Sequence, residues 1–142
     1  MTGVEDEIRK KLVRKALNAR QCAYVQYSHY TVGAALLTAD NKVYQGCNIE
    51  NASYGATNCA ERTAFFKAVS EGEREFRAIA IAGGIDGKEP VDYAYPCGIC
   101  RQVMKEFCRD DFEIIVGKSE KEYKVFTLAE LLPHGFGGDS IR

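Results

Sequence analysis

The chain has 142 residues, a length that suits one domain, and its 46% hydrophobic and 27% charged residues allow a packed core rather than disorder. The 19 Lys and Arg and the 20 Asp and Glu give a net charge of −1 without any basic block, which disfavours a nucleic acid partner. The sequence has no apolar run of roughly 18 residues, so we expect no membrane span.

Hydrophobic periodicity and turn residues predict the elements of the N-terminal half. They indicate a helix over Val4–Ala19, a strand over Thr31–Thr38, a hairpin partner over Val43–Cys47 and a helix over Asn58–Glu71. The segments between them, Gln21–Tyr30 and Asn48–Thr57, are rich in polar and turn residues and are expected to be loops.

The C-terminal half alternates short strands and helices. The pattern predicts strands over Phe76–Ala82, Phe112–Val116 and Tyr123–Phe126, a helix over Gly98–Phe107, and a short last helix opened by a capping box over Thr127–Glu130. Such alternation favours a sheet covered on both faces. We therefore expect one domain over residues 1–142, a three-layer α/β/α sandwich with a mixed sheet of about five strands, and a Gly-rich tail over residues 133–142.

Three of the six cysteines stand at predicted helix starts. Cys59 precedes one helix, and Cys97 and Cys100 form a C-x-x-C pair at the start of another. Helix N-termini favour thiolates, because unpaired N–H groups and the helix dipole stabilise negative charge there. Three thiolates suit zinc, and a three-ligand set leaves a fourth position for water, as catalytic zinc sites require.

Glu61 follows Cys59 by two residues, so it is expected beside the metal without binding it. A carboxylate there can take a proton from an activated water and deliver it elsewhere. A structural alternative is a capping box in which Asn58 is the N-cap and Glu61 the third helical residue. The cysteines beside Glu61 favour the catalytic role.

The C-x-x-C pair is also compatible with a redox role or a purely structural role. A thioredoxin-type redox pair has the same spacing, but this interpretation leaves Cys59-Ala60-Glu61 and Pro96 unexplained. A structural zinc knuckle ranks second, and it needs a fourth ligand, for which Cys22, Cys47, Cys108, His29 and His134 are the candidates. None of these five is paired with another ligand at short spacing.

Cys59-Ala60-Glu61 followed by Pro96-Cys97-Gly98-Ile99-Cys100 resembles the signature of zinc-dependent nucleoside deaminases in its three-cysteine form. The segments 27–36, 48–55 and 96–104 also follow the pattern of the small homotetrameric cytidine deaminases, and the resemblance runs from about Tyr24 to Phe136. It implies a cytidine deaminase-like fold and the hydrolysis of free cytidine or deoxycytidine to uridine or deoxyuridine and ammonia.

The resemblance also implies roles for individual residues. Cys59, Cys97 and Cys100 would bind one Zn²⁺ per subunit, and Glu61 would transfer protons between the attacking water, N3 and the leaving amino group. The backbone N–H of Ala60 would hold the base carbonyl. The ribose would be held by Asn48 and Glu50, a natural donor and acceptor set for a hydroxyl.

Four further residues match positions around the pocket. Tyr30 stands where the family more often has Phe at the pocket wall, and a core aromatic is the alternative. Tyr54 and Phe136 match residues supplied across subunit boundaries, although the tail with Phe136 has the alternative of folding back on its own domain. Arg62 matches an arginine that donates to a zinc thiolate and offsets its charge, where a solvated helix arginine is the alternative.

The predicted partners are a nucleoside substrate and further copies of the chain in a homotetramer, with the tail against a neighbouring subunit. The polar N-terminal segment lacks the apolar core of a signal peptide, which makes a cytoplasmic location the default expectation. Three other functions stay open: deamination of a related small pyrimidine nucleoside, a non-enzymatic zinc-stabilised binding module, and polynucleotide editing, which the balanced charge disfavours.

Overall fold

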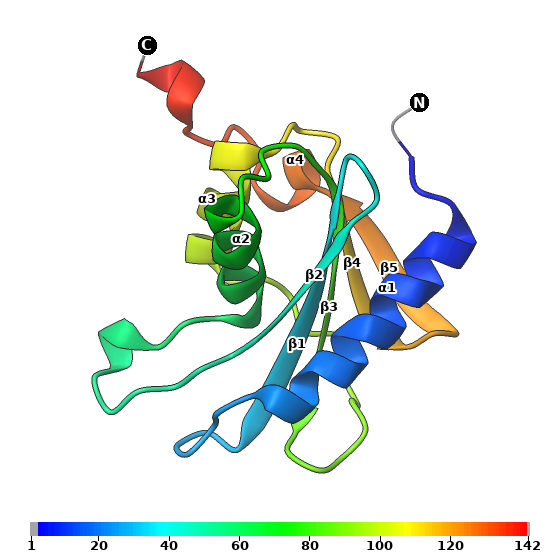
Figure 1. Ribbon diagram of the computed structural model, residues 1–142, viewed down its shortest axis with the longest axis vertical. Coiled ribbons are helices and arrows are strands. Elements are labelled where there is room, and N and C mark those ends of the chain that lie inside the picture. The colour runs from blue at the N-terminus through cyan, green and yellow to red at the C-terminus, as the bar shows by residue number, and fades with distance from the viewer. Residues whose placement is uncertain (1–2, 142) are drawn as a thin grey trace.

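A computed structural model describes residues 3–141 as a five-stranded sheet with helices on both faces (Figure 1). The strands are β1 (Tyr30–Thr38), β2 (Val43–Cys47), β3 (Phe76–Ile85), β4 (Glu113–Ser119) and β5 (Glu122–Thr127). The helices are α1 (Asp6–Ala19), α2 (Ala60–Ser70), α3 (Gly98–Phe107) and α4 (Leu128–Leu131). Among the described residues, no helix combines the length and the hydrophobicity that a bilayer span requires.

The strand order is β2-β1-β3-β4-β5. Strands β3 and β4 are parallel, and every other neighbouring pair is antiparallel, so the sheet is mixed as predicted. The parallel pair needs a crossover connection, and α3 lies in that connection between β3 and β4. This topology brings the start of α3 to the face of the sheet that α2 also covers (Figure 1).

Side-chain alternation along the strands separates the core into two layers. In β1, Leu36 packs with the residues of α2, α3 and α4, whereas Leu37 packs with those of α1. The α1 layer is built largely from small strand residues, Ala35, Ala78, Ala80 and Ala82. These two clusters confirm the predicted three-layer α/β/α arrangement.

Two glycines let helices approach the sheet closely. A Cβ on Gly33 would lie 1.9 Å from the Ala16 carbonyl oxygen of α1. A Cβ on Gly46 would lie 2.4 Å from the Ala60 carbonyl oxygen and 2.5 Å from the Ala64 nitrogen of α2. All three distances are too short for a Cβ atom to occupy. The absence of a side chain at Gly46 therefore determines how closely the first turn of α2 approaches β2.

A buried carboxylate ties the N-terminal segment to the sheet. Glu113, at the start of β4, is 6% exposed. It accepts hydrogen bonds from the Val4 backbone N–H at 3.1 Å and from Arg9 Nε and Nη2 at 3.0 Å each. The fork-like pairing satisfies a charge that would otherwise be costly to bury.

The predicted order of elements is confirmed, and most differences lie at element ends. Helix α2 begins at Ala60 and not at Asn58, because the Asn58 N–H and C=O both pair with Ile49. Strand β3 continues beyond Ala82 to Ile85, because it keeps pairing with β1 as far as Tyr30. Short 3₁₀ turns over Arg20–Cys22, Tyr54–Ala56 and Gly138–Ser140 lie where loops and a tail were expected.

Candidate active site

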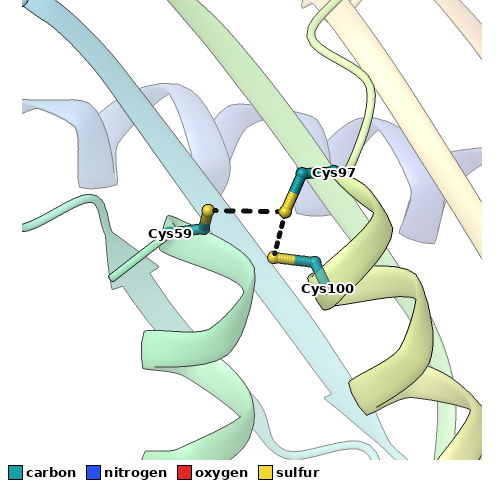
Figure 2. A group of neighbouring side chains, drawn as sticks. All are labelled: Cys59, Cys97 and Cys100. Carbon is teal, nitrogen blue, oxygen red and sulfur yellow. Dashed lines mark hydrogen bonds between the residues drawn. The ribbon is translucent and has the colours of Figure 1, made fainter. Parts of the chain in front are cut away.

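The three cysteines singled out by spacing meet at two helix starts. Cys59 is the N-cap of α2 and Cys97 the N-cap of α3, while Cys100 lies in the first turn of α3. Figure 2 shows their sulfur atoms turned toward one another, with dashed lines joining Cys97 to each of the other two. The Sγ atoms of Cys59 and Cys97 are 3.8 Å apart and those of Cys97 and Cys100 are 3.5 Å apart.

This donor set fits a zinc ion. Zinc–sulfur bonds of about 2.3 Å at tetrahedral angles place neighbouring sulfurs about 3.8 Å apart, close to the two separations observed. In the described chain, the group close enough to share an ion consists of Cys59, Cys97 and Cys100, all within 4.8 Å of one another. His29, His134 and the remaining cysteines lie outside it. Three protein ligands leave a coordination position for water.

Arg62 lies against the first of these sulfurs. Its Nη2 donates to Cys59 Sγ at 3.3 Å, and its buried Nε has no hydrogen-bond partner among the described residues. Hydrogen bonds from Cys100, Arg62 and Cys97 lower the pKa of Cys59 to about 5. The hydrogen bond with Cys59 and burial raise the pKa of Cys100. The first negative charge of the cluster therefore settles on Cys59, beside the guanidinium.

Glu61 is 4% exposed and lies next to the sulfur cluster, where it lines a cavity. Burial raises its pKa to about 7, and the charge on Cys59 contributes to the rise. A carboxyl group with this pKa can both accept and return a proton near neutral pH. The capping-box alternative is wrong, because Cys59 is the N-cap and the Asn58 amide donates to Thr63 Oγ1 instead.

A cavity of about 310 Å³ opens beside the cluster. Tyr30 and Asn48 of the predicted set line it together with Cys59, Ala60, Glu61 and Cys97. Tyr30 is 36% exposed, so it is a wall residue and not part of the core. Ala60 is the first residue of α2, and the first N–H groups of a helix have no partner within the helix. The cavity thus offers a backbone donor beside the sulfurs.

Asn48 is held rigidly at the wall of this cavity. Its Nδ2 donates to the Tyr30 carbonyl and its Oδ1 accepts from the Val32 N–H, both at 2.9 Å. An asparagine amide has two donor hydrogens and two acceptor lone pairs. One of each therefore stays available to a ligand, in a fixed orientation.

Glu50 lines an adjoining cavity of about 360 Å³, which shares Thr57 with the first. Its carboxylate accepts from the backbone N–H groups of Tyr27 and Ser28, each at 3.0 Å, and from the Ser28 hydroxyl. These bonds, with the Ser28 hydroxyl as the largest cause, lower the pKa of Glu50. The carboxylate is therefore ionised and held in one orientation in the adjoining cavity.

Tyr54 and Phe136 lie apart from the sulfur cluster within one chain. Tyr54 is 78% exposed, lines the cavity of Glu50 and makes an edge contact with the Tyr27 ring at 6.4 Å. Phe136 is 60% exposed and lines neither of the two cavities, and its carbonyl accepts from Gln102 Nε2 at 2.7 Å. Both rings are largely exposed at the surface of the subunit.

Residues 6–116 match the family model of the cytidine and deoxycytidylate deaminase zinc-binding region. The chain belongs to this family. It is 50% identical to the cytidine deaminase of Halalkalibacterium halodurans over 94% of this chain and 97% of that protein. It is 47% identical to the cytidine deaminase of Sporosarcina psychrophila, over 93% of each chain. The crystal structure of cytidine deaminase from Burkholderia pseudomallei superposes with a TM-score of 0.81 at 46% identity, covering 89% of this chain and 97% of that one.

Membership of the cytidine and deoxycytidylate deaminase family confirms the predicted resemblance, the α/β fold and the zinc cofactor. The sequence did not single out every residue of the cavity. Thr57, Asn58, Ala94 and Tyr95 also line it. Each lies within three residues of Cys59 or Cys97, so closeness in sequence to a predicted ligand is the signal that could have found them.

Proposed function

We propose that this chain is a zinc-dependent cytidine deaminase that converts free cytidine and deoxycytidine, with water, to uridine and deoxyuridine with release of ammonia. One observation carries the proposal: Cys59, Cys97 and the buried Glu61 border the same cavity, and Cys100 completes a group of three sulfurs within 4.8 Å of one another. A metal-ligand face beside a proton-transferring carboxyl group is what hydrolytic deamination requires.

Cys59, Cys97 and Cys100 would hold the zinc. When bound, zinc supplies Lewis-acid activation of the water that attacks C4 of the base. Glu61 would take one proton from the attacking water and deliver it to N3 of the ring. It would then take the remaining proton from the new hydroxyl at C4 and deliver it to the amino group, which leaves as ammonia while the C4 carbonyl forms. A pKa of about 7 suits this exchange in both directions. Arg62 donates to Cys59 and draws negative charge from the sulfur, which would keep the pKa of the attacking water low.

Polar groups around the cavity would orient the substrate. The Ala60 N–H faces the base carbonyl, and Tyr30 forms the wall beside the ring. Asn48 and Glu50 hold the ribose hydroxyls with the donor and acceptor capacity that their own backbone contacts leave free. Both side chains are already fixed, so binding the sugar costs them little conformational freedom.

The charge around the two cavities favours a nucleoside over a nucleotide. Within the described chain, the linings of the two cavities contain no Lys or Arg, and the adjoining cavity carries the ionised Glu50. A 5′-phosphate would find no cationic partner there and would face a carboxylate. We therefore place the chain with the nucleoside-deaminating members of its family, with a related small pyrimidine nucleoside as the alternative substrate.

The exposed rings support assembly into a homotetramer whose pockets are completed by neighbouring copies. Tyr54 and the tail over residues 133–142, with Phe136, would contribute from one subunit to the site of another. Three thiols that must stay reduced to bind zinc favour a reducing compartment, the cytoplasm. We treat residues 1–142 as one domain in this assembly.

The proposal is tested by measuring zinc content and cytidine turnover on the same preparation. We expect one zinc per subunit and a fall in absorbance as cytidine becomes uridine. Deoxycytidine should be turned over as well, and the corresponding 5′-monophosphates should not. Zinc without turnover of any pyrimidine nucleoside would instead favour a zinc-stabilised binding module.

Substitution of Glu61 separates the chemistry from the fold. Glu61→Gln keeps the size of the side chain but cannot carry a proton, so turnover should fall by about 10²–10⁴-fold or more. Zinc content should stay at the wild-type level, because Glu61 is not a ligand. Joint loss of zinc and of folded structure in this variant would contradict the catalytic role and indicate a structural one.

A further inference from the structure

The Cys97 sulfur contacts both other sulfurs (Figure 2), yet Cys97 precedes its helix and is exposed. The direction of the Cys97 side chain depends on the backbone of Pro96 and Cys97, which lies at the end of the long connection from β3. Pro96 is buried, so its carbonyl needs a hydrogen-bond partner within the protein. The side chain of Arg101 supplies that partner.

Arg101 bonds both carbonyls that flank the Cys97 Cα. Its backbone N–H donates to the Cys97 carbonyl at 3.0 Å, as the helix requires. Its side-chain Nε donates to the Pro96 carbonyl at 2.8 Å. The orientations of both peptide groups around Cys97 are thereby fixed by one residue, which lies four positions further along the chain.

The same guanidinium reaches a third carbonyl from a distant element. Arg101 Nη1 donates to the Leu131 carbonyl at 2.7 Å, at the last residue of α4. Terminal carbonyls of a helix have no partner within it and carry partial negative charge, which suits a cation. The guanidinium therefore joins the turn that carries Cys97 to α4, which packs in the same core layer as α2.

We infer that Arg101 is a positioning residue of the metal centre, which aims the Cys97 sulfur at the other two through the Pro96 carbonyl. This inference rests on the zinc site of the proposed function. Two donors on one rigid plane serve two carbonyls at once, which the single ammonium of a lysine cannot do with the same geometry. Arg101 touches neither of the described cavities, so its effect on the reaction passes through Cys97.

The test compares zinc release from the full-length wild type, Arg101→Met and Arg101→Lys. Methionine keeps much of the apolar stem and removes every donor, and lysine keeps the charge with one point donor. Lys105→Met is the matched control, because Lys105 is a cation of the same helix that pairs with Asp110 and not with the turn. The readouts are the rate of zinc transfer to a chelator and the visible spectrum of the Co²⁺-substituted protein.

Arg101→Met should release zinc about 10- to 100-fold faster than wild type, the usual effect of losing a residue that orients a metal ligand. Arg101→Lys should lie between the two, and Lys105→Met should match wild type. The sulfur-to-cobalt absorption should change in Arg101→Met, because the angle of one thiolate changes. If Arg101→Met does not fold, faster release from Arg101→Lys supports the inference and unchanged release contradicts it.

Wild-type release rates and an unchanged cobalt spectrum in Arg101→Met would overturn the inference, even if the thermal stability of the variant falls. That result would mean that Arg101 only connects α3 to α4 and does not position Cys97. Failure of the zinc site on which the inference rests gives a different result, since the wild-type chain itself would then bind no zinc. If the wild-type chain binds zinc but turns over no nucleoside, the deaminase proposal fails while the comparison of zinc release still tests Arg101.

Discussion

Asn48 and Glu50 each form hydrogen bonds with the backbone and also line a cavity. Asn48 holds the carbonyl of Tyr30 and the N–H of Val32, and Glu50 holds the N–H groups of Tyr27 and Ser28. The contacts of Glu50 lie on the segment that leads into β1, and those of Asn48 lie on the first residues of β1. The proposed substrate contacts of these two residues therefore depend on how well the start of β1 is ordered.

The free energy of unfolding should depend on the ionisation of Glu50 at acidic pH. Its pKa lies below the ordinary value of 4.5, because the Ser28 hydroxyl and backbone N–H groups bond its ionised form. A lowered folded-state pKa means that the ionised group stabilises the fold above its unfolded-state pKa. This contribution is lost as the pH falls through the folded-state pKa.

Glu50→Gln removes the titration, so wild type and variant should differ in free energy of unfolding at neutral pH and converge below pH 4.5. Chemical denaturation at a series of pH values measures the difference. A gap that stays constant through the acid range would show that the hydrogen bonds do not depend on the charge of Glu50.

At this scale the sequence identifies reactive residues better than the residues that support them. Cys59, Glu61, Cys97 and Cys100 were predicted because their spacing has a chemical meaning. The contact of Arg101 with the Leu131 carbonyl joins residues that are far apart in the chain, so no local sequence pattern predicts it. The backbone contacts of Asn48 likewise depend on the position of β1, which the local sequence does not give.

The first turn of α2 is placed by its approach to β2. Gly46 lies directly beneath Ala60, and a Cβ there would lie 2.4 Å from the Ala60 carbonyl oxygen. Any side chain at this position must push α2 away from the sheet. Because Cys59 and Glu61 stand at that end of α2, such a shift also moves the metal centre.

Gly46→Ala should cost about 1–3 kcal/mol of stability through overpacking and lower both turnover and zinc retention. Thermal unfolding and zinc release from the same sample measure the two effects. Gly55→Ala is the matched control, because a Cβ there meets nothing within 4 Å. Wild-type stability in Gly46→Ala would show that α2 and β2 can separate without cost.

The types of the elements followed from the sequence, and their ends depended on tertiary partners. Val43–Cys47 and Gly98–Phe107 have the predicted bounds. Helix α1 begins at Asp6 and not at Val4, because the Val4 N–H is bonded to Glu113. Helix α2 loses its first two predicted residues to the pairing of Asn58 with Ile49 and to the N-cap position of Cys59. Partners so distant in sequence leave no mark on local periodicity.

The whole molecule exposes large aromatic rings at its surface. Tyr54 and Phe136 are 78% and 60% exposed, and Gln102 holds the Phe136 backbone against α3. The tail is therefore fixed in position while its ring faces outward. In the proposed tetramer this ring enters the pocket of a neighbouring copy and stacks on the base.

Phe136→Ala should lower kcat/KM without unfolding the subunit. Loss of an aromatic stacking contact, about 0.5–1.5 kcal/mol, corresponds to a fall of up to about 10-fold. Steady-state kinetics and circular dichroism on the same protein measure the two quantities, and sedimentation gives the oligomeric state. Unchanged kcat/KM would contradict a role of the ring in substrate binding.

Mixed assemblies test whether the ring acts between subunits. Phe136→Ala subunits keep Glu61, and Glu61→Gln subunits keep Phe136. Reassembled together, they should form some sites with both residues intact, so the activity per Phe136→Ala subunit should rise. Activity that stays at the level of Phe136→Ala alone would place the ring at the site of its own chain.

At this scale the sequence predicted the three layers and the mixed sheet but not the order of strands. The alternation of Leu36 and Leu37 shows that both faces of β1 are buried, without showing which helix covers which face. The place of β1 between β2 and β3 depends on pairing across the long segment that contains α2. Sequence periodicity carries no information about such distant pairing.

The contact of Glu113 with Val4 and Arg9 has a consequence for synthesis on the ribosome. The chain emerges from its N-terminus, yet the carboxylate that anchors its first helix lies more than a hundred residues later. Until β4 has been translated, α1 has neither that anchor nor the complete sheet on which to pack. We therefore expect α1, although it is translated before the sheet is complete, to be among the last elements to reach its final packing.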